Sequence, residues 1–257
     1  MGYEPQFNRL RLYNLFMGFL HLVQGLLIIL LSNDFKLPIT TSFLTLNQGT
    51  GKLWPETSVL VNLPFGLLVA VFLLLSAAAH FTVASPVAFG WYVKNLKKGI
   101  NYARWYEYSL SASLMIVLIG MLCGVYDLGA LLMAFALTGV MNLCGLVMEV
   151  HNQTTAKTNW TSYVVGCIAG AVPWVAIAIY FFGSLAKADE GVPKFVYAIL
   201  PTLFVFFFCF AVNMVLQYKK AGKWRDYIFG ERMYILLSLI AKSALAWQVF
   251  AGTLRPV

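Results

Sequence analysis

The amino-acid sequence predicts an all-α membrane protein, a single bundle of seven transmembrane helices. Three observations support this fold class. Apolar residues make up 60% of the 257 residues and charged residues only 11%, whereas about a quarter of a soluble domain is charged. The mean hydropathy is +0.77. A helix needs about 20 apolar residues to cross roughly 30 Å of hydrocarbon, and the chain has seven such stretches.

The seven predicted spans occupy most of the chain, which leaves no room for a separate soluble domain within residues 1–257. They cover approximately residues 12–31, 58–83, 103–125, 128–150, 161–182, 195–217 and 231–254. The first stretch is too long for a signal peptide and lacks a small-residue cleavage site, so we interpret it as a retained span. Pro64, Pro173 and Pro201 lie within spans and are expected to kink them.

The longest break between spans is residues 32–57. Its middle is rich in Thr, alternates in polarity and is flanked by Pro38 and by Gly49 and Gly51. This pattern is consistent with a short exposed β-hairpin. By contrast, the connection around Asp127 is tight, which predicts that the third and fourth spans are antiparallel neighbours.

The distribution of basic residues predicts the orientation in the membrane, because loops rich in Lys and Arg stay cytoplasmic. With the N-terminus inside, twelve basic residues fall on the cytoplasmic side: Arg9, Arg11, Lys94, Lys97, Lys98, Arg104, Lys157, Lys219, Lys220, Lys223, Arg225 and Arg232. Five fall outside: Lys36, Lys52, Lys187, Lys194 and Arg255. The N-terminus is therefore predicted to be cytoplasmic and the C-terminus extracellular. The net charge of +8 then reflects topology and attraction to anionic lipids, and no nucleic-acid partner is expected because the basic residues are dispersed.

Lys242 is the most informative ionisable residue, because it lies near the middle of the last span, in MYILLSLIAKSALAWQVF. A charge in hydrocarbon costs several kcal/mol, so an intramembrane lysine is a functional candidate. It must be paired, neutral or covalently modified, and a desolvated amine is the form that condenses with an aldehyde to a Schiff base. The alternative is a structural ion pair that fixes the register of the helix.

Glu107, near the cytoplasmic end of the third span, is the expected partner of Lys242. Their backbone depths differ by roughly 10 Å at helical rise, and a lysine side chain that leans toward its helix N-terminus closes most of that gap. Pairing with Arg104, three residues earlier on the same helix face, is the alternative for Glu107. Ser238 precedes Lys242 by one turn and is placed to hydrogen-bond near the amine.

His21 and His80 lie in the first two spans, in the same half of the membrane as Glu107. Each alone is more typical of a hydrogen-bonded packing histidine. Together with a carboxylate and an amine they predict a proton-accepting polar cluster. Glu149, which closes the fourth span beside His151, is interpreted more simply as an interfacial residue.

Seven spans with a buried lysine in the last one resemble the retinal proteins, and the pattern resembles the heliorhodopsin family specifically. The match rests on Glu107 in ARWYEYS, on Ser238 and Lys242 in LLSLIAKSALAW, on His21 and His80, and on the inverted topology. Pump-type microbial rhodopsins have an aspartate one turn before the retinal lysine, whereas this chain has Ser238. The missing second acid argues against a standard proton pump.

The resemblance implies all-trans retinal on Lys242 through a protonated Schiff base, with Glu107 as counterion and Ser238 bonded nearby. His21 and His80 are expected to receive the proton after light-driven isomerisation. The family is generally described as non-pumping, slow in its photocycle and dimeric, with a signalling role and an unidentified cytoplasmic partner expected. The loop 32–57 resembles the family's extracellular hairpin, which contributes to the dimer contact.

Two alternatives stay open from the sequence. The first is an ion transporter or channel driven by the same pigment. The second is a retinal-free seven-span transporter or receptor in which Lys242 and Glu107 form a substrate-binding ion pair. An enzyme is not expected, because the chain shows no nucleophile and base set, metal motif or phosphate loop. In every case the predicted location is the cell membrane, as a multi-pass protein in contact with its lipids.

Overall fold

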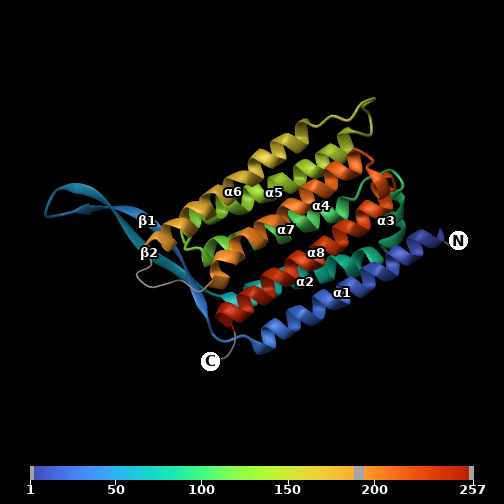
Figure 1. The fold of residues 1–257 in the computed structure, drawn as a ribbon. Helices are drawn as coiled ribbons and strands as arrows, with labels where there is room; N and C mark the ends of the chain where they lie inside the picture. Colours follow the sequence, from blue (N-terminus) through green and yellow to red (C-terminus); the bar gives the residue numbers. More distant parts are fainter. Residues whose placement is uncertain (1–2, 188–193, 255–257) are drawn as a thin grey trace.

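The computed structural model describes residues 3–187 and 194–254 and shows an elongated bundle of helices (Figure 1). Seven helices within the described residues are long and apolar enough to cross a membrane, as predicted. These are α1 (Pro5–Leu31), α2 (Phe65–Ala84), α4 (Tyr102–Leu122), α5 (Leu128–His151), α6 (Thr161–Ala186), α7 (Lys194–Tyr218) and α8 (Tyr227–Val249), the last continued by a π-helical turn, η2 (Phe250–Leu254). The described parts of the chain begin and end at opposite ends of the bundle, as an odd number of spans requires.

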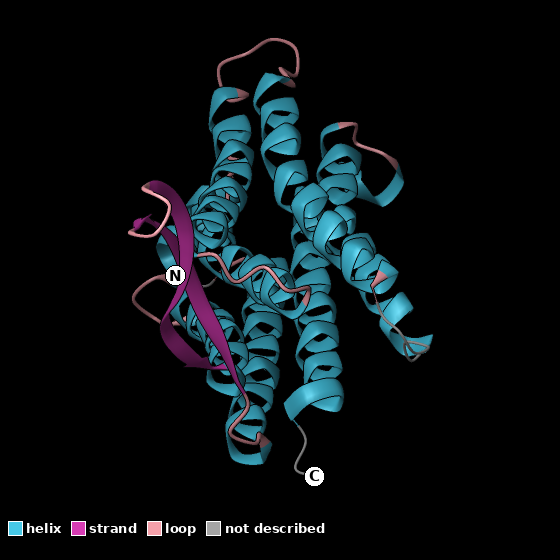
Figure 2. Ribbon diagram, turned by 90° about the vertical axis from the view of Figure 1, so that its left-hand side faces the viewer, coloured by secondary structure: helices cyan, strands magenta, loops and turns pink. Residues whose placement is uncertain are grey.

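A long antiparallel hairpin projects from one end of the bundle (Figures 1 and 2). Its strands are β1 (Lys36–Asn47) and β2 (Lys52–Pro64), paired from Lys36 with Pro64 to Asn47 with Lys52. At the base, the Thr40 amide donates to the Tyr126 carbonyl at 2.8 Å, so the hairpin is fixed to the α4–α5 connection. We call this the hairpin end of the bundle and the opposite end the N-terminal end.

The predicted start of the second span at residue 58 is wrong. Residues 58–64 belong to β2, and α2 begins at Phe65. The segment is apolar enough for a span, but it is rich in β-branched residues, which favour a strand. Pro64 was expected to kink the span; it ends the strand and directly precedes the helix, where its missing N–H leaves no helical hydrogen bond unmade.

At the N-terminal end, more of the chain is helical than the sequence predicted. Helix α1 begins at Pro5, and a short helix, α3 (Phe89–Leu96), lies between α2 and α4. Lys97 donates to Glu4 at 2.7 Å, and the exposed pair lowers the pKa of Glu4 through this hydrogen bond. Arg255, counted among the basic residues outside, lies beyond the described residues.

The buried residues divide along the bundle axis. Toward the hairpin end the core is apolar and includes Phe65, Phe72, Ile119, Leu245 and Val249. The buried ionisable side chains of the described chain lie instead at the level of Lys242 or nearer the N-terminal end: His21, His80, Arg104, Glu149, Glu231 and Lys242. The two halves of the bundle therefore differ sharply in polarity.

Close packing between α4 and α5 depends on Gly145. A Cβ built at this position would lie 2.3 Å from the Trp105 ring, whose Nε1 donates to Glu149 at 2.7 Å. We expect Gly145→Ala to displace the indole, weaken this hydrogen bond and cost about 1–3 kcal/mol, as overpacking does. The measurement is thermal unfolding of the purified protein. Gly183→Ala is the matched control, because a Cβ at Gly183 of α6 meets nothing within 4 Å; equal effects of the two substitutions would contradict the prediction.

Candidate functional site

Helices α8, α4 and α2 bring three polar side chains together in the middle of the bundle. The Lys242 amine donates to Glu107 Oε1 at 2.6 Å and also to the Ser76 hydroxyl. Ser76 in turn donates to the same Glu107 oxygen at 2.7 Å. The side chain of Lys242 is only 4% exposed and that of Glu107 10%. The structure thus joins the two residues that the sequence paired.

Ser76 is the member of this group that the sequence analysis missed. It lies in LLLSAAAH, four residues before His80 on the same face of α2. Ser238, the hydroxyl that the sequence placed near the amine, lines the adjoining cavity. The hydrogen bonds that the structure shows for Lys242 go to Ser76 and Glu107, so a direct role of Ser238 stays a prediction.

His21 and His80 lie one above the other at the interface of α1 and α2. Their rings are nearly parallel, with an angle of 14° and centroids 5.6 Å apart. His80 Nδ1 lies 2.8 Å from Asn14 Oδ1, so Asn14 fixes the orientation of that ring. Both ring nitrogens of His21 are buried without a hydrogen-bond partner in the described structure. The two histidines are therefore together, as expected, and Asn14 is an addition from the structure.

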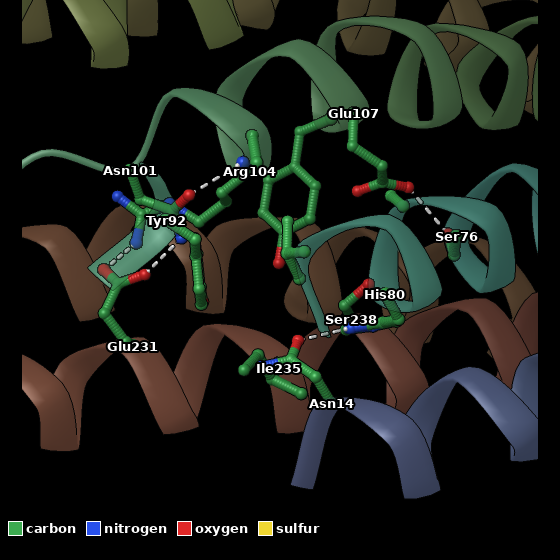
Figure 3. Close-up of a pocket in the computed structure, with 14 residues that line it drawn as sticks. Asn14, Ser76, His80, Tyr92, Asn101, Arg104, Glu107, Glu231, Ile235 and Ser238 are labelled. Carbon is green, nitrogen blue, oxygen red and sulfur yellow. Dashed lines mark hydrogen bonds and ion pairs between the residues drawn. The ribbon is translucent and has the colours of Figure 1, made fainter. Parts of the chain in front are cut away.

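A polar cavity of about 40 Å³ extends from this site toward the N-terminal end (Figure 3). Ser76 and Glu107 line it at one end, His80 at the side, and Arg104 and Glu231 at the other end. A water molecule needs roughly 10–15 Å³ of such space and two to four polar partners. The cavity is large enough for water, and polar side chains of both sites line it, so it lies between the Lys242 site and a second group of buried charges.

This second group is centred on Arg104. Its guanidinium pairs with Glu149 at 2.5 Å and with Glu231 in a second ion pair. The interfacial interpretation of Glu149 is wrong, because its side chain is 1% exposed. Arg104 is committed to these two carboxylates, so the alternative pairing of Glu107 with Arg104 is wrong as well.

Further donors complete the Arg104 cluster. Asn101 donates through its backbone N–H to Glu149 at 2.9 Å and through its side-chain amide to Glu231 at 2.6 Å. The guanidinium also lies over the ring of Tyr234, at 3.9 Å from the centroid. Partners of this kind make a buried ionic group tolerable, although the Arg104 Nε is left without one in the described structure. Removing one partner from a buried pair costs about 3–5 kcal/mol.

On the opposite side of Lys242 the lining becomes apolar. A cavity of about 50 Å³ next to the amine is lined mainly by Met115, Met141, Phe207 and Phe210. A neighbouring cavity of about 90 Å³ shares Met141 and both phenylalanines and continues toward α6. Close by, Trp174 of α6 packs edge-on against Phe207 at 5.2 Å, so the aromatic residues of α6 and α7 form one wall of this region.

The fold and this site define the class of protein. Two solved structures have the same fold: a cyanorhodopsin from the cyanobacterium Tolypothrix sp. NIES-4075 (TM-score 0.66, 16% identity, covering 98% of this chain and 96% of that one), and a light-driven proton pump from Leptosphaeria maculans (TM-score 0.64, 13% identity, covering 96% and 95%). The chain thus has the seven-helix fold of microbial rhodopsins. A search of curated proteins found no match.

The family is defined more narrowly than the fold. The heliorhodopsin family matches residues 10–254, and the chain belongs to that family. It is a multi-pass integral membrane protein of the retinal photoreceptor type, and its chromophore is retinal. The residues present fit this cofactor, because a buried primary amine with a carboxylate beside it adjoins two neighbouring, mainly apolar cavities with aromatic walls.

The hydroxyl that contacts the amine leads to a spectroscopic prediction. Because Ser76 contacts both Lys242 and Glu107, Ser76→Ala is expected to shift the absorption maximum of the retinal-loaded protein by more than Ser238→Ala does. Visible absorption spectra of the two variants and the parent protein test this. A larger shift in Ser238→Ala would restore Ser238 as the principal hydroxyl at the amine.

Proposed function

We propose that this protein is a light sensor that signals without pumping ions. All-trans retinal, bound through a protonated Schiff base at Lys242 Nζ, would supply visible absorption and light-driven isomerisation. The observation that carries the proposal is the pairing of a lysine in the middle of α8 with Glu107, 2.6 Å away, in the interior of the bundle. The other steps follow from the residues around this pair.

Glu107 has the role of counterion in this proposal. A positive charge at Lys242 Nζ is costly in a buried site unless a negative charge lies close to it. The Glu107 carboxylate supplies that charge, and the hydrogen bond from Ser76 holds the carboxylate in place. Together these two residues keep a proton at Nζ in the dark.

The N-terminal half of the bundle has the acceptors for this proton after light absorption. The polar cavity connects the neighbourhood of Nζ with His80 and, beyond it, with Glu231. His21, which stacks on His80, supplies a second imidazole. Toward the hairpin end the described residues offer an apolar core with no buried ionisable side chain. A proton that leaves Nζ therefore stays in one half of the membrane, and no net ion transport follows.

The proposed orientation places the N-terminal end of the bundle in the cytoplasm. The twelve basic residues assigned to the cytoplasmic side all lie at this end, in α1, in α3 and its connection to α4, at the starts of α4 and α8, and in the connections between α5 and α6 and between α7 and α8. This asymmetry supports the orientation through the positive-inside rule. A signalling partner would then bind at the end of the bundle toward which the polar cavity extends.

The proposed assembly is a homodimer, to which the hairpin contributes. Leu44 and Trp54 on the two strands are each 68% exposed, and Phe43 is 57% exposed. Large apolar side chains gathered on an exposed hairpin are typical of a protein interface. In the proposed orientation, the end of the bundle from which the hairpin projects is extracellular, so the dimer contact would form outside the cell.

The first experiment is a visible absorption spectrum of the protein expressed with all-trans retinal. The parent should show a visible band, and Lys242→Ala should abolish it. Glu107→Gln should shift the band strongly or abolish it at neutral pH, because the positive charge at Nζ loses its partner. Lys98→Ala and Glu56→Gln, which change exposed residues, are the matched controls. No band in the parent would overturn the proposal, and an unchanged Glu107→Gln spectrum would remove Glu107 as counterion.

Photocurrents test the absence of transport. Because the buried ionisable groups lie on one side of Lys242, illumination of voltage-clamped cells that express the protein should give only small transient charge movements and no stationary current. A light-driven proton pump measured in parallel provides the positive control. A sustained current that scales with light intensity would favour the transporter alternative.

A further inference from the structure

A further cavity lies at the N-terminal end of the bundle, away from Lys242. It has a volume of about 280 Å³ and lies between the α5–α6 connection and the segment from the end of α7 to the start of α8. Its lining includes Thr155 and Thr158 from the first segment and Lys220, Trp224 and Arg225 from the second. The proposed photoreceptor mechanism does not use this cavity.

The charge of the lining is positive. Lys220 and Arg225 contribute two cations, and no Asp or Glu side chain lines the cavity. Neither cation belongs to any of the ion pairs found among the described residues, which join Lys97, Arg104 and Lys242 to carboxylates elsewhere. A cavity that gathers two uncompensated cations attracts an anion.

The walls of the cavity are held in place before any ligand binds. Asn152 accepts from the Asn159 amide at 2.7 Å and from the Thr155 hydroxyl at 2.9 Å, which fixes the α5–α6 connection. Trp224 donates to Asn213 at 2.6 Å, which anchors the opposite wall. Lys220 itself has a φ of 50°, a left-handed conformation that ends α7, where the Ala221 amide donates back to the Leu216 carbonyl at 3.0 Å.

One lining residue is a buried amide. Gln217 is 7% exposed, and its amide nitrogen donates to the Tyr227 carbonyl at 3.2 Å, which joins the end of α7 to the start of α8. Its side-chain oxygen is buried and does not face the cavity. The cavity therefore offers two cations for an oxyanion.

We infer that this cavity binds a phosphate group, as in a phosphorylated small metabolite or the headgroup of an anionic phospholipid. A phosphate monoester bears a charge of about −1.5 to −2 at pH 7, which matches the two cations, and the phosphodiester of a phospholipid headgroup bears a single negative charge that the same cations attract. Arginine and lysine side chains form charge-assisted hydrogen bonds with phosphate oxygens. The inference goes beyond the proposed photoreceptor function and does not depend on it.

The site also touches the buried charges of the bundle. Tyr227 lines the cavity, and its hydroxyl donates to Glu149 at 3.2 Å, within the Arg104 cluster. A bound phosphate would therefore lie one residue away from the polar network that continues toward Lys242.

The test uses the retinal-loaded full chain in nanodiscs of phosphatidylcholine, titrated calorimetrically with glycerol 3-phosphate. We expect saturable binding that Lys220→Gln and Arg225→Gln each weaken about 10- to 100-fold, as expected for loss of a charge-assisted hydrogen bond. Lys219→Gln is the matched control, because Lys219 is the exposed neighbour of Lys220 and does not line the cavity. Glycerol, which lacks the phosphate, should not bind.

A second arm distinguishes the source of the phosphate. Nanodiscs that contain phosphatidylglycerol are analysed by native mass spectrometry for lipid retained by the protein. Retention by the parent and by Lys219→Gln, but not by Lys220→Gln or Arg225→Gln, would support a lipid headgroup as the ligand even without glycerol 3-phosphate binding. No binding in either arm, or binding that the two cavity substitutions leave unchanged in folded protein, would overturn the inference.

Discussion

The contact between the Lys242 amine and the Glu107 carboxylate constrains the rest of the structure. Two opposite charges in a membrane interior are tolerable only as partners with further hydrogen bonds. Their contact at 2.6 Å fixes the depth of α8 relative to α4, and Ser76 adds α2 to the same register. Three helices from distant parts of the chain are thus aligned by one polar contact. The apolar cavity beside the amine lies between two of these helices, α4 and α8, and α5 and α7.

The Arg104 cluster is a second solution to the same physical problem, nearer the N-terminal end. It uses three charges in place of two, and it satisfies them with donors from Asn101 and Trp105. The two groups belong to the same half of the bundle and are connected by the polar cavity. The Lys242 group pairs one cation with one carboxylate, whereas the Arg104 cluster places one cation between two carboxylates, so the second group has the excess of acid.

The sequence predicted the features that a single strong energetic term decides. The cost of a charge in hydrocarbon selected Lys242 and Glu107, and the length of a membrane crossing gave the seven helices. The prediction from the sequence failed where two energetic preferences of the same segment compete. Residues 58–64 suit a span by hydropathy and a strand by side-chain branching, and only the pairing with β1 decides between them.

The sequence also did not identify which buried charged residues form ion pairs with each other. Glu149 and Glu231 lie at helix ends, where an exposed carboxylate and a buried one have the same sequence environment. Their common partner, Arg104, is distant in the chain from both, so helical spacing could not identify the ion pairs. The consequence for function is physical: a second buried acid pair lies in the half of the bundle that already contains the histidines. The absence of an acid one turn before Lys242 therefore concerns only the helix face nearest the amine, and the acceptors in the proposed function, His80 and Glu231, line the cavity that extends from this site toward the N-terminal end.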